Sequence, residues 1–366
     1  MRVVYLADAP YIHTRRWVEH FAGVGWDVHV ISFRPAEIEG ATVHYVHGFE
    51  RIGRARYLVH ARRVRRLVAS LEPDLLHAHH VTSYGFLAGL CDVHPTLVSV
   101  WGTDILEAPE WTPLHHRLTR FALDRADHVT ATGLRLANAT LRYMPRAKPV
   151  TVVSYGVDLE RFPLRDAGLQ RVPVVGTVAR LSREKGLDVL LRAIAIVVSD
   201  AGRALRLLIV GDGPERRKLE RLADRLGIGD ITEFRGEIPH DDVPAALAEL
   251  DIFAMPSLAE GFGVAALEAA ATGLPVVASD VHGIPDVVDH LRTGLLVPPA
   301  NPAALAAALT QLLDDGELSV KLGTAGRAFV QEHYRWQDNA EQMERLYQDL
   351  LQTFTVGRTH ATLPES

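Results

Sequence analysis

Cysteine and lysine are scarce in this 366-residue chain. The one cysteine, Cys91, excludes an intrachain disulfide and is typical of a protein in a reducing compartment. Because no base or metal ligand is evident beside it, we expect Cys91 to fill core space rather than act as a nucleophile. Lysine makes up only four of the 39 basic residues, at Lys148, Lys185, Lys218 and Lys321.

Long apolar runs are also missing. No stretch reaches membrane-spanning length, and Asp8 interrupts the first apolar segment too early for a signal peptide. These two absences predict a cytoplasmic protein. The net charge of −6 and the lack of basic residues interleaved with aromatic ones argue against nucleic acid as a partner.

Charge is divided unevenly between the two halves of the chain. Residues 1–173 carry 21 Lys and Arg against 17 Asp and Glu, whereas the rest carries 18 against 28. The histidines divide 13 to 5. At a length of 366 residues, this asymmetry predicts two domains of different chemistry.

Strands and helices alternate in both halves, which predicts an α/β fold with parallel sheets and crossover helices. The strands expected in the first half lie near residues 3–7, 27–33, 42–46, 74–79, 96–101, 128–132 and 151–153. Those expected in the second half lie near residues 174–178, 205–210, 231–235, 252–255, 276–278 and 295–297. Helices follow most of these strands, for example over residues 13–22 and 186–199.

Weak periodicity and frequent glycine and proline place a linker between the two halves. We expect an N-terminal domain over residues 1–153, the linker over 154–173 and a C-terminal domain over 174–335. A long polar helix should follow over 336–353, and a frayed tail over 354–366.

The stretch from Pro256 to Ala271 carries the most distinctive pattern. Its glycines predict a loop around Glu260, and alanine-rich composition predicts a helix from Val264. Backbone N–H groups at a helix start suit an anion such as phosphate. Glu268 falls within this apolar helix, where a buried carboxylate needs a partner. The pattern therefore indicates hydroxyl recognition beside a phosphate. The alternative is that Glu268 pairs with a core arginine and the glycines merely turn the chain.

Three further loops follow expected strands in the second half. Arg180 and Lys185 together would neutralise a diphosphate, unless their loop is solvated and pairs with itself. The turn around Gly211 and Gly213 permits close backbone approach, to a phosphate, to a sugar or only to its own chain. A third loop, residues 281–285, again contains a glycine. Ligands bind at the carboxyl ends of open parallel sheets, so four such loops favour one nucleotide-like site.

A dinucleotide fingerprint is a competing interpretation of the same glycines. Gly261-x-Gly263-x-x-Ala266 matches it, and Asp280 lies where a ribose-binding acid belongs. Against a nicotinamide-dependent oxidoreductase, the strand ends near Met255. The fingerprint needs its first glycine in the turn directly after the strand.

Four runs, in this order, closely resemble those of family 4 glycosyltransferases of the glycogen synthase or group 1 type. They are Arg180–Gly186, Val210–Pro214, Pro256–Ala269 with its glutamates seven residues apart, and Pro275–Ala278. The resemblance spans nearly the whole chain. It implies a GT-B fold, with two Rossmann-like doubly wound domains facing a central cleft. It also implies a retaining enzyme that moves a hexosyl group from a UDP- or GDP-sugar to an acceptor hydroxyl, in glycan, glycolipid or glycoconjugate biosynthesis.

The resemblance assigns roles to residues of the second domain. It places the catalytic Glu260 against the donor hexose, Glu268 on the ribose, and Arg180 and Lys185 on the donor phosphates. It also implies that the last helix crosses back to the first domain. The remaining donor-binding residues of this domain are Gly211, Gly213, Gly261, Phe262, Gly263 and Val264.

The first domain departs from the family pattern. Where many relatives have a glycine pair after the first strand, this chain has residues 8–14, so His13 or Thr14 would contribute at the helix start. Trp101 stands where many relatives have a histidine that touches the sugar, and a Trp ring nitrogen cannot accept a hydrogen bond. Asp104, as a catalytic residue, or His79, on the acceptor side with Trp101, are the candidates to replace that histidine.

The histidines of the fourth expected strand allow two interpretations. Alternation puts His77 and His79 on one face, as a metal site would need, but no carboxylate or cysteine is evidently paired with them. The alternative that we favour is a polar lining of the cleft.

The mechanism that we expect uses no metal and no cofactor besides the nucleoside diphosphate sugar. No DxD-type metal motif occurs, and no residue is evidently placed as a covalent nucleophile. Front-side attack, with the leaving phosphate accepting the acceptor proton, is therefore favoured. The alternatives are a sugar-nucleotide epimerase or phosphorylase of the same fold, and a non-catalytic sugar-nucleotide-binding subunit.

A basic helix is expected in the first domain. Seven arginines fall between Arg51 and Leu71, on a segment whose apolar residues recur at helical spacing. Such a helix could contact anionic lipid, which would suit a lipid-linked acceptor. Alternatively, its apolar stripe faces the core and the arginines face water.

Overall fold

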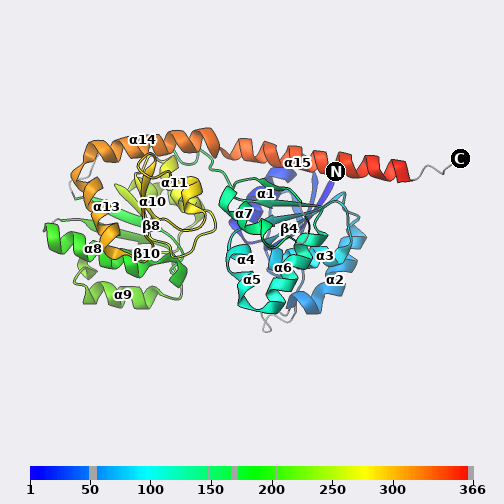
Figure 1. Ribbon diagram of the computed structural model, residues 1–366, viewed down its shortest axis with the longest axis horizontal. Helices are drawn as coiled ribbons and strands as arrows, with labels where there is room; N and C mark the ends of the chain where they lie inside the picture. The colour runs from blue at the N-terminus through cyan, green and yellow to red at the C-terminus, as the bar shows by residue number, and fades with distance from the viewer. Residues whose placement is uncertain (49–55, 145, 147, 166–171, 203, 362–366) are drawn as a thin grey trace. The chain divides into compact units, whose positions relative to one another are not determined.

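The computed structural model describes residues 1–48, 56–144, 146, 148–165, 172–202 and 204–361 (Figure 1). The chain forms two compact units. Unit 1 comprises Met1–Tyr155 and Asp338–Ser366, and unit 2 comprises Gly156–Gln337. Each unit contains one parallel sheet with helices on both faces (Figure 1).

The sheet of unit 1 has seven strands in the order β3-β2-β1-β4-β5-β6-β7. Every neighbouring pair is parallel. The strands are β1 (Arg2–Leu6), β2 (Asp27–Ser32), β3 (Ala41–Tyr45), β4 (Leu75–His79), β5 (Thr96–Val100), β6 (His128–Ala131) and β7 (Val150–Val152). Its central strands are buried on both faces, as parallel strands covered by helices are.

The sheet of unit 2 has six parallel strands in the order β10-β9-β8-β11-β12-β13. They are β8 (Val174–Val178), β9 (Arg206–Val210), β10 (Thr232–Gly236), β11 (Ile252–Met255), β12 (Val276–Ser279) and β13 (Gly294–Val297). In both sheets the strand order reverses beside the first strand. The prediction of an α/β fold with two doubly wound parallel sheets is therefore confirmed.

Helices connect the strands. Unit 1 contains α1 (Ile12–Gly23), α2 (Arg56–Leu71), the π-helix η2 (His80–Gly85), α3 (Phe86–Cys91), α4 (Thr103–Leu106), α5 (Ala108–Trp111), α6 (Pro113–Arg125) and α7 (Leu134–Leu141). Unit 2 contains η3 (Arg183–Lys185), α8 (Leu187–Ala201), α9 (Arg216–Arg225), η4 (Gly229–Ile231), η5 (His240–Asp242), α10 (Val243–Ala248), α11 (Val264–Ala271), α12 (Ile284–Val287), α13 (Pro302–Asp314) and α14 (Gly316–His333). No helix in the described part of the chain is long and apolar enough to cross a membrane.

The last helix, α15 (Trp336–Ala361), is longer than predicted. The sequence analysis ended it at residue 353 and expected a frayed tail, which was wrong for residues 354–361. Two threonines in this part of the helix bond back along it. The Thr353 and Thr355 hydroxyls donate to the carbonyls of Asp349 and Leu351, each 2.8 Å away.

Much of the expected linker packs onto unit 2. Val157 and Phe162 are buried, and the Val157 N–H donates to the carbonyl of Tyr334 (2.7 Å). The Arg327 guanidinium donates to the carbonyls of Phe162 (2.6 Å) and Ala271. The segment therefore has its own apolar and polar anchors, and only residues 166–171 fall outside the described residues.

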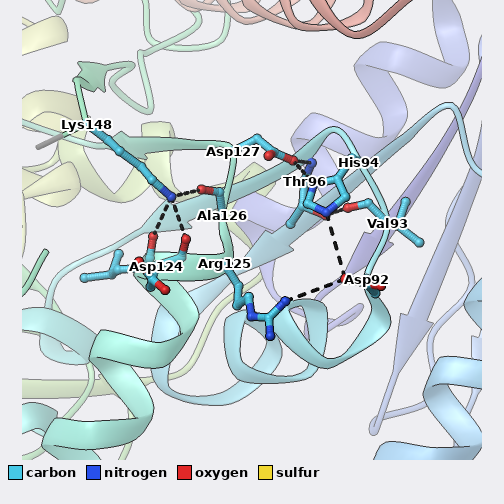
Figure 2. Close-up of polar contacts among 10 residues, drawn as sticks. Asp92, Val93, His94, Thr96, Asp124, Arg125, Ala126, Asp127 and Lys148 are labelled. Carbon is cyan, nitrogen blue, oxygen red and sulfur yellow. Dashed lines mark hydrogen bonds and ion pairs between the residues drawn. The ribbon is translucent and has the colours of Figure 1, made fainter. Parts of the chain in front are cut away.

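A polar cluster closes unit 1 at the amino ends of β5 and β6 (Figure 2). There Lys148 Nζ donates to the carbonyls of Asp124 and Ala126, each 2.6 Å away, and so caps the end of α6. Asp127 accepts from the Thr96 N–H (2.7 Å). Lys148, one of the four lysines, thus has a structural role at the amino ends of the unit 1 strands.

Cys91 is buried in the unit 1 core, as predicted. Its thiol donates to the Leu87 carbonyl (3.2 Å), and burial raises the pKa of that thiol to about 12. A thiol that stays protonated is a poor nucleophile, so the core-filling interpretation is confirmed.

Candidate functional site

Four loops meet at the carboxyl ends of the unit 2 strands. The Leu181 N–H donates to the Asp212 carbonyl (2.9 Å), which joins the loops after β8 and β9. The Leu258 N–H donates to the Glu184 carbonyl (2.8 Å), which joins the loop after β8 to the loop after β11. The Gly283 N–H donates to the Glu260 carbonyl (3.2 Å), which adds the loop after β12. The loops therefore form one continuous surface.

Two glycines allow this close approach. Gly186 has φ +61°, and a Cβ there would lie 2.1 Å from the Pro256 carbonyl oxygen. A Cβ at Gly283 would lie 2.1 Å from the Gly261 carbonyl oxygen. Both positions exclude any side chain, so the glycines hold the loops against one another.

An ion pair joins two of the predicted site residues. Lys185 Nζ lies 2.7 Å from Glu260 Oε2, with both side chains largely shielded from solvent. Glu184 bonds instead to the Ser182 hydroxyl (2.5 Å). Lys185 therefore pairs with a residue of the loop after β11 and not with one of its own loop. The alternative interpretation, a loop that pairs with itself, required the opposite.

Glu268 lies on α11 with only 6% of its surface exposed. Its Oε1 is 2.9 Å from His240 Nε2. The alternative interpretation, in which Glu268 pairs with a core arginine, is wrong, because the partner is a histidine from η5. The sequence analysis did not identify His240, which lies 28 positions from Glu268 in a polar run without a motif.

The start of α11 has the geometry expected of an anion cradle. Gly263 precedes the helix with φ +98°, and the first N–H groups bonded to its carbonyl are those of Ala266 (3.0 Å) and Leu267 (3.1 Å). The N–H groups of Val264 and Ala265 come before these bonds, at the positive end of the helix. The Phe262 side chain is buried, so this residue can reach a ligand only through its backbone. Arg180 is exposed, and its guanidinium forms no hydrogen bond or ion pair with the described residues. These groups give the surface a positive end beside two carboxylates.

Gly211 and Gly213 have structural tasks. The Gly211 N–H donates to the Gly236 carbonyl (2.7 Å), and the Gly213 N–H donates to Asp212 Oδ1 (2.6 Å). A Cβ at Gly213 would lie 2.4 Å from the Leu181 carbonyl oxygen. Both amides are used within the protein, which agrees with the interpretation as a tight turn.

The dinucleotide fingerprint does not have its required geometry. β11 ends at Met255 and α11 begins at Val264, so a long loop separates the strand from the helix. Gly261 therefore does not lie in a tight turn directly after the strand, and its loop cannot present a pyrophosphate as that motif does.

An aromatic cluster lies at the carboxyl ends of β1, β4 and β5 in unit 1. The Trp101 ring centroid is 4.3 Å from that of His79 and 5.5 Å from that of Tyr11, while His13 stacks on Tyr155 at 3.8 Å. Trp101 is 8% exposed and Tyr11 is 41% exposed. His80, which the sequence analysis did not select, also packs on Trp101. This surface can stack on a ring but offers few acidic or basic groups.

Asp104 is buried and bonded to the backbone. Its Oδ1 accepts from the N–H groups of Trp101 (3.0 Å) and Gly102 (2.9 Å), and its Oδ2 accepts from that of Val81 (2.9 Å). With 3% of its surface exposed, this carboxylate holds the loop that carries Trp101. The structure thus gives Asp104 a structural role, and its catalytic role stays a prediction.

The strand histidines and Thr14 are fully buried, so they cannot line a cleft. His77 uses both ring nitrogens, towards the Tyr347 hydroxyl (2.5 Å) and the Ser99 hydroxyl (2.7 Å), which leaves none for a metal. The Thr14 hydroxyl is 3.1 Å from His79 Nδ1. The donor role of Thr14 and the acceptor role of His79 stay predictions, and the structure gives neither side chain any exposed surface. Thr14 on α1 and His79 on β4 are buried because these two elements pack against each other.

Comparison with known proteins identifies two family matches. Residues 166–329 match the family model described as Glycosyl transferases group 1, and residues 2–133 match the one described as Glycosyl transferase 4-like. The chain is 33% identical over 311 residues to the D-inositol 3-phosphate glycosyltransferase of Corynebacterium urealyticum, covering 76% of this chain and 72% of that protein.

Two further similarities are relevant. The chain is 32% identical over 304 residues to a GDP-mannose-dependent alpha-(1-6)-phosphatidylinositol monomannoside mannosyltransferase of Mycobacterium tuberculosis, covering 75% of each. Among solved structures, Anabaena HepE in complex with UDP-glucose aligns with a TM-score of 0.82 at 20% identity, covering 95% of this chain and 100% of that one. The latter supports the fold.

Proposed function

The chain belongs to the group 1 glycosyltransferases, and we propose that it moves a hexosyl group from a nucleoside diphosphate sugar to an acceptor hydroxyl with retention of configuration. The family resemblance drawn from the motifs is confirmed by these matches. The donor, the acceptor and the stereochemistry are parts of the proposal.

One observation carries it: the phosphate-binding and hydroxyl-binding groups gather on one surface of unit 2. The exposed guanidinium of Arg180, the ammonium of Lys185 and the first turn of α11 favour a diphosphate. Glu260 and Glu268 lie beside them as hydrogen-bond acceptors for hydroxyl groups. A sugar nucleotide presents both a diphosphate and sugar hydroxyl groups to such a surface.

The Lys185–Glu260 ion pair would be rearranged when the donor binds. We propose that Lys185 turns to the β-phosphate and Glu260 accepts from hexose hydroxyls, so that each keeps a charged or polar partner. The bond from the anomeric carbon to the β-phosphate oxygen then breaks. Arg180, Lys185 and the α11 amides stabilise the charge that develops on the leaving diphosphate.

Retention would follow from attack on the face that the diphosphate leaves. The acceptor oxygen bonds to the anomeric carbon, and its proton passes to the departing phosphate oxygen. No metal is required in this scheme, because two basic side chains and a helix N-terminus supply the positive charge. Relatives that use GDP-mannose or glycosylate D-inositol 3-phosphate support a UDP- or GDP-hexose donor and a polyol or glycolipid acceptor.

Contact with an anionic membrane surface, on the cytoplasmic side, is a further part of the proposal. Val64 and Val68 of α2 are buried, so its apolar stripe faces the core, as the alternative interpretation held. On the outer face, however, Leu58 and Val59 are about half exposed beside exposed arginines, Arg62, Arg63, Arg65 and Arg66. Arg51 and Arg54 of the predicted cluster lie outside the described residues. Exposed apolar side chains among arginines are typical of interfacial helices.

A donor panel tests the proposal. Wild-type protein is melted and assayed for nucleoside diphosphate release with UDP-, GDP- and ADP-hexoses, with and without EDTA. Glu268→Ala is the test variant, and Glu332→Ala, an exposed glutamate on α14, is the matched control. We expect one donor to raise the melting temperature of the wild type and the control, to be hydrolysed slowly despite EDTA, and to bind the test variant at least about tenfold more weakly.

Other outcomes of the panel would overturn parts of the proposal. Sugar conversion without any acceptor would indicate an epimerase, and release that depends on inorganic phosphate would indicate a phosphorylase. Tight donor binding without turnover in the presence of acceptors would indicate a non-catalytic subunit. The anomeric configuration of the product, read by proton NMR, decides between retention and inversion.

A further inference from the structure

We propose that His240 is a positioning residue of the donor site, which orients the Glu268 carboxylate for the ribose hydroxyls of a nucleoside diphosphate. This inference rests on the proposed function, because it takes Glu268 as the ribose ligand. His240 belongs to none of the motifs, and its role is to hold the carboxylate of Glu268 in place.

The geometry gives Glu268 one protein partner. His240 opens η5, directly after the loop that follows β10, while Glu268 lies in the middle of α11. The Nε2 to Oε1 distance is 2.9 Å. In the described part of the chain, Oε2 of Glu268 has no hydrogen-bond donor. One carboxylate oxygen is therefore held by the protein and the other is open to a ligand.

Arg161 determines which nitrogen of His240 carries the proton. Its Nη2 lies 3.4 Å from His240 Nδ1 and also pairs with Asp241. Because a guanidinium can only donate, this contact favours the tautomer that accepts at Nδ1 and carries its hydrogen on Nε2, from which it donates to Glu268 Oε1. A neighbouring aromatic ring, Phe162, packs against His240 at 6.1 Å.

A histidine suits this task better than the core arginine of the alternative interpretation. A guanidinium would engage both carboxylate oxygens through its fork and leave only their outer lone pairs for hydroxyls. A neutral imidazole gives one hydrogen bond to one oxygen and leaves the full negative charge. Glu268 is nearly buried among apolar neighbours, so without this donor its carboxylate would lack a fixed orientation. A vicinal diol can then donate to a carboxylate that is already in place.

The test compares nucleotides that differ only at the ribose. Affinities of the full-length protein for UDP, GDP, dUDP and dGDP are measured by isothermal titration calorimetry. The variants are His240→Ala, His240→Gln, Glu268→Ala and the pair His240→Ala with Glu268→Ala. His333→Ala, a half-exposed histidine at the end of α14, is the matched control.

We expect His240→Ala to raise the Kd for the preferred ribonucleotide about tenfold while changing that of its 2′-deoxy counterpart much less. His240→Gln should recover part of the loss, because its amide Nε2 can donate in place of the imidazole. In the double variant the two effects should not add, because both act through one carboxylate. Donor KM should rise more than kcat falls.

The failure modes are distinguishable. If His240→Ala weakens ribo- and deoxyribonucleotides equally, its role is only structural and the inference is overturned. If it weakens neither, while Glu268→Ala still removes the preference for ribose, the inference fails and the proposed function stands. If Glu268→Ala itself leaves that preference intact, the ribose assignment of Glu268 in the proposed function fails.

Discussion

At the scale of single residues, Asp104 is an example of a carboxylate whose surroundings decide its task. It follows β5 at the end of the sheet where ligands usually bind, which made it a catalytic candidate. Its oxygens, however, accept three backbone N–H groups from two different segments. A buried carboxylate held in this way fixes the backbone of both segments.

Asp104→Asn tests that role. The amide can still accept from Trp101 and Gly102 through Oδ1, but its NH2 group would face the Val81 N–H, donor against donor. We expect a loss of about 1–3 kcal/mol in the free energy of unfolding of unit 1, measured by urea denaturation followed by tryptophan fluorescence. If stability is unchanged and turnover of bound donor is lost, the catalytic assignment would return.

Which site residues the sequence could predict depends on how local their pattern is. Glu260, Lys185 and Arg180 belong to glycine-containing loops at the carboxyl ends of predicted strands, which favoured one shared site, and the family resemblance supplied their roles. His240 could not be found in this way, because its partner is separated by β11 and a long loop. The burial of Thr14 and His79 could not be predicted either, because it depends on packing between β4 and α1 that alternation does not specify.

At the scale of elements, the periodic patterns predicted strands and helices well, and the errors lie at ends and connections. The segment after Gly156 looked like a linker because of its prolines and glycines, yet Val157 and Phe162 anchor it to unit 2. From this segment Arg161 reaches His240. A stretch without periodicity can thus still support a site, through long-range contacts such as that of Arg161 with His240, which no local pattern predicts.

The exposed arginines on the outer face of α2 are expected to bind anionic lipid. Replacing Arg62, Arg63, Arg65 and Arg66 by glutamine keeps helix propensity and removes four exposed positive charges. Because each basic residue near an anionic surface contributes roughly 1 kcal/mol, binding to vesicles rich in phosphatidylglycerol should fall by at least about a hundredfold. Vesicle cosedimentation measures it, with phosphatidylcholine vesicles as the uncharged reference.

A matched control uses arginines of another helix. A variant with glutamine at Arg216, Arg217, Arg221 and Arg225 of α9 also loses four positive charges, from unit 2, and should bind vesicles as the wild type does. Equal loss in both variants would mean that only net charge matters. No binding of the wild type at low salt would refute membrane contact through α2.

At the scale of the whole molecule, contacts between segments far apart in the chain complete unit 1. The Tyr347 hydroxyl of α15 bonds to Tyr5 (2.9 Å) and to His77, which lies 270 positions away. The same ring stacks on Phe21 at 4.5 Å. Sequence patterns predicted the helix but not this network, since no local signal couples a tyrosine near the end of the chain to a histidine in β4.

This buried network makes the stability of the protein depend on pH. Burial lowers the pKa of His77 to about 3 and that of His79 well below its usual value, so both rings are neutral in the folded protein. In the unfolded chain they take up protons near pH 6.5. The stabilising contribution is therefore fully present above pH 6.5 and is lost as the pH falls towards 3.

We expect the free energy of unfolding to fall by about 2 kcal/mol per buried histidine between pH 7 and pH 5, where most carboxylates are still ionised. Urea denaturation at both values measures it, and His77→Gln provides the comparison. That variant should be less stable at pH 7, because a glutamine cannot match both hydroxyl partners. Between pH 7 and pH 5, however, its free energy of unfolding should fall by about 2 kcal/mol less than that of the wild type, because it has one buried histidine fewer. A wild type equally stable at both values would mean that these rings take up no protons on unfolding, and the buried neutral network would be refuted.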